Sequence, residues 1–272
     1  MWSKFSSSPR FRGEGDRSRG EGWRGPSFGR KDPSTALRAV PLPSKGWGGC
    51  LAAVLILAGC RQGPQQPQFP KVEREVAPIV GDSFSTEDAR DRLGEAEEVI
   101  RLAGVTPGMW VADIGAGEGY YTVRLAPVVG RRGRVLAEDI VPETIDLLAQ
   151  RVHREKLDNV AVVLGQEDNP KLPPKSFDRI FMVHMYHEVR SPYAFLWHLR
   201  EGLKPGGQVI VVDSNRPPKR HGMPPALLRC EFAALGLKLE QLRSVAAGEA
   251  YLASFTAAAT RPEPQQIKPC RA

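Results

Sequence analysis

A glycine-rich segment is the clearest sign of ligand binding in this chain. It reads Asp113-Ile114-Gly115-Ala116-Gly117-Glu118-Gly119 and follows the apolar run 110–114. Open parallel sheets bind ligands where a strand ends and a helix begins, and glycines there let the backbone approach a ligand closely. In the nicotinamide fingerprint a third Gly or Ala stands three residues after the second, but here that position is Tyr120. The spacing therefore disfavours NAD, and Asp113 suits the ammonium group of an amino-acid ligand better than a pyrophosphate.

A second carboxylate ends the next apolar run, residues 134–139. An acid at the carboxyl end of a strand can accept hydrogen bonds from both ribose hydroxyls of an adenosyl group. Side chains alternate between the two faces of a strand. We favour Asp139 over its neighbour Glu138 for this role.

Strand-like and helical patterns alternate from residue 85 to residue 257, which is typical of a mostly parallel sheet covered on both faces. The predicted strands are 109–114, 134–139, 160–164, 178–184, 208–213, 237–244 and 250–257. The predicted helices are 85–103, capped by Ser85 or Thr86, and about 120–128, 142–154, 192–203 and 223–235. Only residues 245–249 separate the last two strands, so they should form an antiparallel hairpin. The predicted fold is an α/β three-layer sandwich with seven strands and a C-terminal hairpin.

These motifs closely resemble the first and second motifs of class I (Rossmann-like) S-adenosylmethionine-dependent methyltransferases. The resemblance spans about residues 85–257 and is strongest at 109–140 and 176–213. It implies S-adenosylmethionine as the cofactor, with its ribose on Asp139. The residues that the resemblance places at the methionine part are Asp113, Gly115, Ala116, Gly117 and Gly119.

The resemblance also implies an acid after the third strand that binds the adenine amine. The common family form has Asp directly after the glycine, where this chain has Gln166, so the role passes to Glu167 or Asp168. His184, at the end of the fourth strand, is expected to contact the cofactor through its backbone.

The segment Met185-Tyr186-His187-Glu188 follows the fourth strand, where the family places groups that face the methyl acceptor. Tyr186, His187 and Glu188 are therefore the catalytic candidates. Methyl transfer needs alignment and at most one general base, and His187 can act near neutral pH. Alternatively, His187 or Glu188 caps the following helix. No metal site is expected.

Charge helps to identify the class of acceptor. Residues 1–60 carry six of the seven net positive charges, so the rest of the chain is close to neutral. A nucleic-acid partner would need a clustered basic face. We therefore expect a small-molecule methyl acceptor, such as a quinone-like, lipid or phenolic compound, and no nucleic acid. The alternative is a non-catalytic lipoprotein that retains the fold as a ligand-binding module. The sequence does not indicate an oligomeric state.

The N-terminal region indicates export. Residues 1–49 are rich in Gly, Ser, Arg and Pro and are expected to be disordered, or to result from a misassigned start. Residues 45–60 resemble a signal peptide, whose apolar run is too short to span a bilayer. Leu57-Ala58-Gly59-Cys60 resembles a bacterial lipobox, which implies lipidation of Cys60 and a periplasm-facing membrane anchor. Alternatively, the apolar run packs on the domain and the protein is cytoplasmic, where S-adenosylmethionine is made.

The remaining segments are a linker over 61–84, a methyltransferase-like domain over 85–260 and a flexible tail over 261–272. Cys230 and Cys270 have no CxxC spacing. They could form a disulfide in an oxidising compartment. We favour a buried thiol at Cys230, because apolar residues flank it.

Overall fold

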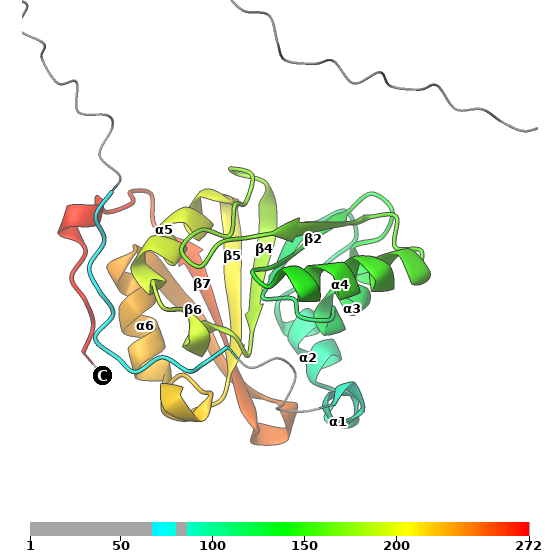
Figure 1. The fold of residues 1–272 in the computed structure, drawn as a ribbon, viewed down its shortest axis with the longest axis horizontal. Helices are drawn as coiled ribbons and strands as arrows, with labels where there is room; N and C mark the ends of the chain where they lie inside the picture. Colours follow the sequence, from blue (N-terminus) through cyan, green and yellow to red (C-terminus); the bar gives the residue numbers. More distant parts are fainter. Residues whose placement is uncertain (1–66, 80–85, 272) are drawn as a thin grey trace, which may run out of the picture. The chain divides into compact units, whose positions relative to one another are not determined.

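The computed structural model describes residues 67–79 and 86–271 (Figure 1). The predicted signal peptide, lipobox and disordered N-terminus lie outside these residues. The strands are β1 (Trp110–Ile114), β2 (Arg134–Asp139), β3 (Val160–Leu164), β4 (Phe177–Val183), β5 (Leu203–Asp213), β6 (Leu237–Val245) and β7 (Ala250–Ala257). The α-helices are α1 (Glu87–Arg92), α2 (Glu95–Leu102), α3 (Tyr120–Val129), α4 (Pro142–Arg154), α5 (Pro192–Glu201) and α6 (Pro225–Ala234). Short 3-10 helices are η1 (Tyr186–Glu188), η2 (Pro218–Arg220), η3 (Ala246–Gly248) and η4 (Pro264–Gln266).

The seven strands form one sheet in the order β3-β2-β1-β4-β5-β7-β6. Strands β3, β2, β1, β4 and β5 are parallel, and β7 is antiparallel to both β5 and β6. The predicted fold is confirmed, including the C-terminal hairpin, because only η3 joins its two strands. The strand order reverses between β1 and β4, and ligands of such sheets bind at the carboxyl ends beside this point.

Two apolar layers cover the sheet (Figure 1). Neighbouring residues of β4 face opposite layers, as strand geometry requires. Phe181 packs with Val99 of α2 and Leu125 of α3, whereas Ile180 packs with Leu196 of α5 and Phe232 of α6. The sheet edge that carries the predicted site residues is therefore held between rigid layers.

The prediction of one helix over 85–103 is wrong, because this segment forms two helices, α1 and α2. Gly94 has a φ of +63°, so the right-handed helix cannot continue through it. Helix α1 ends before this residue and α2 begins after it. The predicted cap at Thr86 is present, since its hydroxyl accepts a hydrogen bond from the Ala89 N–H at 3.3 Å.

The tail after Arg261 packs against the domain, so the prediction of a flexible tail is wrong. Ile267 and Cys270 are buried, and the N–H of Cys270 donates to the Tyr193 hydroxyl at 2.6 Å. Cys270 also forms a disulfide with Cys230 of α6. The expectation of a free thiol at Cys230 is therefore wrong as well.

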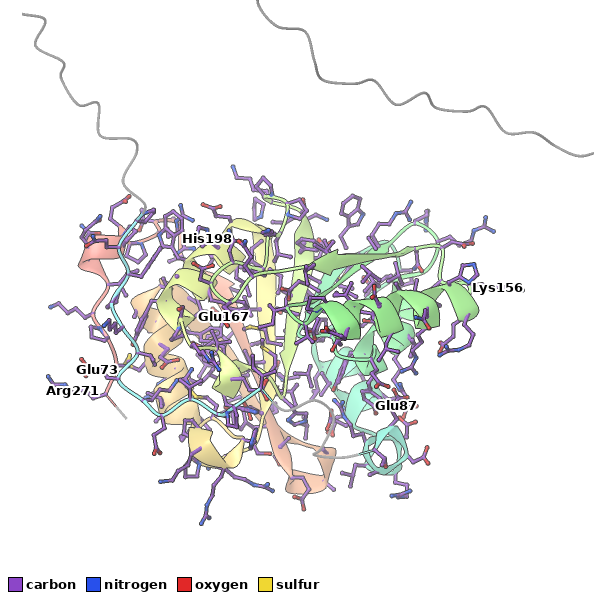
Figure 2. All side chains as sticks on the ribbon, viewed as in Figure 1. Glu73, Glu87, Lys156, Glu167, His198 and Arg271 are labelled. Carbon is purple, nitrogen blue, oxygen red and sulfur yellow. A yellow bond between two sulfur atoms is a disulfide. The ribbon has the colours of Figure 1, made fainter. Side chains whose placement is uncertain are left out.

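Part of the predicted linker is also a packed segment. Residues 67–79 run alongside the tail, and the side chains of Glu73 and Arg271 meet at 3.4 Å (Figure 2). The ring of Phe69 lies edge-on to Trp197 of α5, with 5.7 Å between centroids. Arg74 and Ala77 are buried. The domain thus includes a strap of chain that the local sequence pattern did not reveal.

We expect the Cys230–Cys270 disulfide to stabilise this arrangement. The cysteines are 40 residues apart, and closing a loop of this length in the unfolded chain contributes about 2–4 kcal/mol. Cys270→Ser should therefore lower the free energy of unfolding by that amount in urea. Adding a reductant to wild type should reproduce the loss and leave the variant unchanged. A variant as stable as the oxidised wild type would contradict the prediction.

Candidate functional site

The glycine loop between β1 and α3 has a backbone conformation that residues with a Cβ rarely adopt. The φ angles of Gly115, Gly117 and Gly119 are +65°, +56° and +91°. A Cβ at Gly115 would lie 2.9 Å from Met185 Cγ, and one at Gly119 would lie 2.6 Å from Leu148 Cδ1. A Cβ at Gly117 would meet no described atom within 4 Å. The loop is therefore packed at both ends and open at its middle, where a ligand can approach the backbone.

Asp139 lies directly against this loop. One of its carboxylate oxygens accepts a hydrogen bond from the Gly117 N–H at 3.0 Å, and the other accepts from the Val141 N–H at 3.0 Å. The N–H of Ala116 donates to the backbone carbonyl of Glu138 at 2.9 Å. The structure thus brings together the loop and the acid at the end of β2.

Asp113 lies beneath the loop and is buried. Its carboxylate accepts a hydrogen bond of 2.7 Å from the Thr122 hydroxyl on α3. Burial raises the pKa of Asp113 to about 6, against the effect of this hydrogen bond. In the described structure Asp113 ties β1 to α3, and its contact with an ammonium group stays a prediction.

Glu138 is a second buried acid that the sequence analysis set aside. Its Oε2 lies 3.4 Å from the Gly115 N–H, and its Oε1 has no hydrogen-bond partner among the described residues. A Cβ at Gly165 would lie 1.5 Å from Oε1. Burial, together with the nearby charge of Asp139, raises the pKa of Glu138 to about 8, against the effect of the Gly115 hydrogen bond. An acid within a buried strand is the sequence signal that could have identified this residue.

The acids after β3 do not join Asp139. Gln166 and Asn169 close a tight turn through reciprocal backbone hydrogen bonds, and both Glu167 and Asp168 on it are exposed. Glu167 lies 3.7 Å from Arg190 on the surface (Figure 2). Their role in binding adenine therefore stays a prediction.

His184 ends β4 with a φ of +53°. Its N–H donates to the Val212 carbonyl at 2.8 Å, and its Nε2 lies 3.1 Å from Glu95 of α2. Although burial opposes it, His184 and Arg90 lower the pKa of Glu95 to about 2. The His184 ring thus binds α2.

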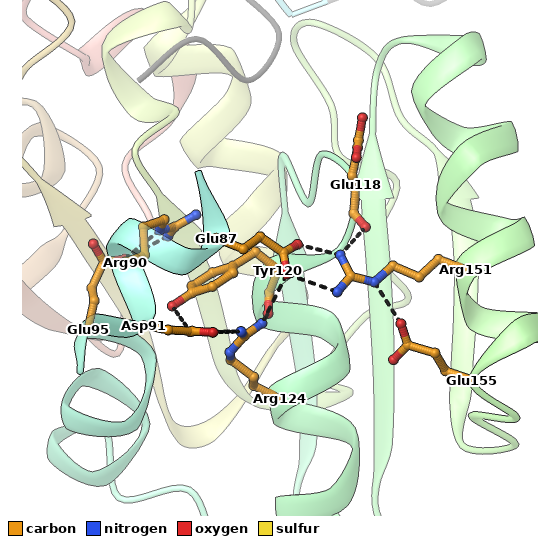
Figure 3. Close-up of polar contacts among 9 residues, drawn as sticks. All are labelled: Glu87, Arg90, Asp91, Glu95, Glu118, Tyr120, Arg124, Arg151 and Glu155. Carbon is orange, nitrogen blue, oxygen red and sulfur yellow. Dashed lines mark hydrogen bonds and ion pairs between the residues drawn. The ribbon is translucent and has the colours of Figure 1, made fainter. Parts of the chain in front are cut away.

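Helix α1 is fastened beside the glycine loop by ion pairs (Figure 3). Glu87 pairs with Arg151 of α4, and Asp91 pairs with Arg124 of α3. Arg151 also donates to the backbone carbonyl of Glu118 in the loop at 3.0 Å. These contacts hold α1 against α3 and against the C-terminal end of α4, beside the glycine loop.

Beyond β4, Tyr186 and His187 have different positions, although both are buried. The Tyr186 hydroxyl donates to Glu231 of α6 at 2.7 Å. Burial raises its pKa well above the usual value, so it is unsuited to accept an acceptor's proton. The His187 Nδ1 lies 2.9 Å from Asp213, which is buried at the end of β5. The structure thus holds His187 in place through Asp213 and sets Tyr186 apart from it.

His221 is a further residue at this place that the sequence analysis missed. Its Nδ1 lies 3.8 Å from Oε1 of Glu188, and that oxygen lies 4.0 Å from Nε2 of His187. The two imidazole rings are nearly perpendicular, with centroids 5.5 Å apart. The available signal was that η2 follows β5, whose carboxyl end lies beside that of β4. We call His187, Glu188 and His221 the His-Glu-His cluster.

Met185 connects the two halves of the site. Its side chain packs against Gly115 of the glycine loop, and the residue directly precedes η1, which carries His187 and Glu188. The glycine loop and the His-Glu-His cluster are therefore connected through this one residue.

Comparisons with known proteins agree with this geometry. Residues 111–207 match a family described as a methyltransferase domain. The protein-L-isoaspartate O-methyltransferase of Pyrococcus horikoshii is 32% identical over 114 residues, which cover 42% of this chain and 48% of that protein. The demethylmenaquinone methyltransferase of Tropheryma whipplei is 36% identical over 118 residues, 43% of this chain and 46% of that protein. This chain thus spans about half the length of these relatives.

The fold comparison covers more of the chain. A crystal structure of an S-adenosylmethionine-dependent methyltransferase from Aquifex aeolicus aligns with a TM-score of 0.56 and 24% identity. It covers 63% of this chain and 98% of that one, which shows a shared fold. The matched family region contains the glycine loop, Asp139 and His187. Residues 111–207 therefore resemble a methyltransferase domain, and the chain shares the fold of an S-adenosylmethionine-dependent methyltransferase.

Proposed function

We propose that this chain transfers the methyl group of S-adenosylmethionine to a small-molecule acceptor that lies beside His187. The observation that carries the proposal is that Met185 connects two polar sites, since its side chain packs against Gly115 and its backbone leads into η1. One is the open glycine loop with Asp139, and the other is the buried His187–Asp213 pair. The first suits the cofactor and the second suits a group that must lose a proton.

Residues of this chain would align the cofactor with the methyl acceptor. The open backbone at Gly117 would receive the methionine part of the cofactor, and Asp139 would accept the ribose hydroxyls. A carboxylate oxygen has two lone pairs, so the bonds from Gly117 and Val141 leave capacity for this. S-adenosylmethionine supplies a methyl group on a positively charged sulfur. His187, held through Nδ1, presents Nε2 on the side where the acceptor loses its proton.

Two observations support a compact acceptor. The side chains of His187, Glu188 and His221 are only 3%, 17% and 13% exposed, so the cluster is recessed. Residues 61–272 are close to neutral, which gives a nucleic acid little electrostatic attraction. A small uncharged molecule can reach such a site more easily than a folded macromolecule can.

The proposal is tested with methyl-labelled S-adenosylmethionine and a cell extract separated into small-molecule and protein fractions. We expect the label to enter the small-molecule fraction with wild type and to reach a much lower level with Asp139→Ala. Label in the protein fraction would overturn the acceptor class, and label in neither fraction would overturn the activity.

Asp139→Ala should weaken cofactor binding by about 1–3 kcal/mol, or roughly 5- to 150-fold, because the ribose loses a hydrogen-bond acceptor. Calorimetry with S-adenosylmethionine measures this directly. The matched control is Asp146→Ala, which removes an exposed carboxylate from α4 and should leave the affinity unchanged. Equal affinity in Asp139→Ala and wild type would move the role to Glu138.

We also propose that the protein is exported and anchored to the cell envelope through a lipid on Cys60. The lipobox-like motif supports this, and so does the Cys230–Cys270 disulfide, because disulfides persist in oxidising compartments. Among residues 67–79 and 86–271, no helix has the length and apolar character needed to cross a bilayer.

We expect a fatty-acid probe to label wild-type protein in bacterial cells and to leave Cys60→Ala unlabelled. Cys230→Ala serves as the control, because it removes a cysteine from the folded domain and keeps the lipobox. Equal labelling of wild type and Cys60→Ala, or labelling of neither, would refute the lipid anchor.

A further inference from the structure

We infer that His187, Glu188 and His221 bind a divalent transition-metal ion of the Zn²⁺ class beside the methyl acceptor. This inference deepens the proposed function, because the metal would lie on His187, beside the proposed methyl acceptor. It assigns the His-Glu-His cluster a role that the sequence did not suggest.

The spacing of the three side chains fits one ion. One potential ligand atom from each residue lies within 4.8 Å of the other two. Ligand atoms about 2.0–2.2 Å from a tetrahedral Zn²⁺ lie about 3.4 Å from one another. Small side-chain rotations therefore bring all three atoms into the first coordination shell.

Asp213 orients the first ligand. Its carboxylate lies 2.9 Å and 3.1 Å from Nδ1 of His187, which leaves Nε2 for the metal. Metal-binding histidines commonly hold a carboxylate with their other nitrogen, which fixes the ring and increases its basicity. Asp213 is fully buried, so this support is rigid.

Arg74 holds the backbone beneath the first two ligands. Its guanidinium donates to the carbonyl oxygens of Tyr186, His187 and Val189 at 3.3–3.4 Å. The N–H of Ala77 donates to the His187 carbonyl at 3.1 Å. The strap of residues 67–79 thus fixes η1, from which His187 and Glu188 project.

The third ligand is fixed by the loop after β5. His221 has a φ of +52°, and its N–H donates to the Pro218 carbonyl at 2.9 Å. A Cβ at the neighbouring Gly222 would lie 2.6 Å from Arg216 Cβ, so this loop is closely packed. All three ligands therefore lie at one sheet edge on positions that the fold determines.

The ligand types favour Zn²⁺ over a hard cation. Mg²⁺ and Ca²⁺ prefer oxygen ligands throughout, whereas two imidazoles and one carboxylate with an open position form a common catalytic zinc site. An acceptor hydroxyl bound at the open position would lose its proton more readily, because the ion lowers the pKa of a bound oxygen. The proton would pass to solvent, and the oxygen lone pair would then attack the methyl carbon of the cofactor. The S–CH3 bond would break with its electron pair left on sulfur, so that the cofactor departs as a neutral thioether.

The test uses purified full-length protein dialysed against a chelator and titrated with Zn²⁺ by calorimetry and with Co²⁺ by visible absorption. We expect one ion per chain and the intense bands of tetrahedral Co²⁺. His221→Ala should abolish these bands and weaken Zn²⁺ binding at least 100-fold, and Asp213→Asn should weaken it about 10- to 100-fold. The matched control is His153→Ala, an exposed histidine of α4, which should bind as wild type does.

A titration with S-adenosylmethionine on the same samples separates this inference from the proposed function. Cofactor binding by His221→Ala shows that the variant is folded. Wild type that binds cofactor but no stoichiometric metal overturns the metal site and leaves the proposed function standing. Equal metal binding by wild type and His221→Ala also overturns the site. Wild type that binds metal but no cofactor supports the metal site and overturns the proposed function.

Discussion

Arg74→Met should lower the free energy of unfolding by about 3–5 kcal/mol, the range for breaking a buried ion pair from one side. Arg74 Nε lies 2.9 Å from Glu231 Oε1, and both side chains have no solvent exposure. Removing the guanidinium leaves the Glu231 charge buried with only the Tyr186 hydroxyl as a described hydrogen-bond donor. It also removes the donor to three backbone carbonyls of the segment that carries His187 and Glu188.

Urea denaturation followed by circular dichroism measures this loss. The matched control is Arg271→Ala, because the pair of Arg271 with Glu73 is largely exposed, and such pairs contribute at most about 1 kcal/mol. The double variant Arg74→Met with Glu231→Leu should recover part of the stability, since no buried charge remains. If Arg74→Met were no less stable than Arg271→Ala, the strap would not stabilise the domain as we describe.

The importance of Arg74 could not be predicted from the sequence for a physical reason. Its partners Glu231 and His187 lie 157 and 113 residues away, and the segment around it has no helical or strand periodicity. His221 was missed for a similar reason, since it joins His187 only through the pairing of β4 with β5. Contacts between distant segments leave no local pattern.

Most of the fold was predictable because its signals are local. Parallel strands buried on both faces are short apolar runs, and all seven predicted strands are present, with β5 beginning five residues earlier than expected. The glycine loop was predictable because tight turns restrict residue type, whereas the role of Asp139 stays a prediction. Tyr186 was misplaced because spacing along a 3-10 turn does not indicate which side chain faces the core. The helix break at Gly94 was not predicted, because the helical pattern of the sequence continues on both sides of this residue.

The buried carboxyl of Glu138 should make the stability of the protein depend on pH. In the unfolded chain the carboxyl titrates near 4.5, whereas in the folded protein burial raises its pKa to about 8. Between these values the unfolded chain releases a proton that the folded protein retains. Stability should therefore fall as pH rises, by about 1.4 kcal/mol per unit, and become level above about pH 8. The total loss is on the order of 5 kcal/mol.

Glu138→Gln tests this prediction because glutamine has nearly the same shape and does not titrate. The free energy of unfolding is measured by urea denaturation from pH 5 to pH 9 for wild type and for Glu138→Gln. Near pH 5 the two proteins should differ only by a constant offset. As pH rises, wild type should lose stability relative to the variant. Glu118→Gln is the control, since it removes an exposed carboxylate from the glycine loop. Parallel profiles for wild type and Glu138→Gln would mean that Glu138 is ionised in the folded protein.

The same experiment bears on the cofactor. Oε1 of Glu138 lies beside Gly165, at the start of the loop after β3, and has no hydrogen-bond partner among the described residues. A cofactor hydroxyl that donated to this oxygen would stabilise the ionised form and lower the pKa of Glu138. We plot the free energy of unfolding against pH for wild type and for Glu138→Gln. Saturating S-adenosylmethionine should then reduce the difference between the slopes of these two plots. A slope difference that the cofactor leaves unchanged would assign the ribose to Asp139 alone.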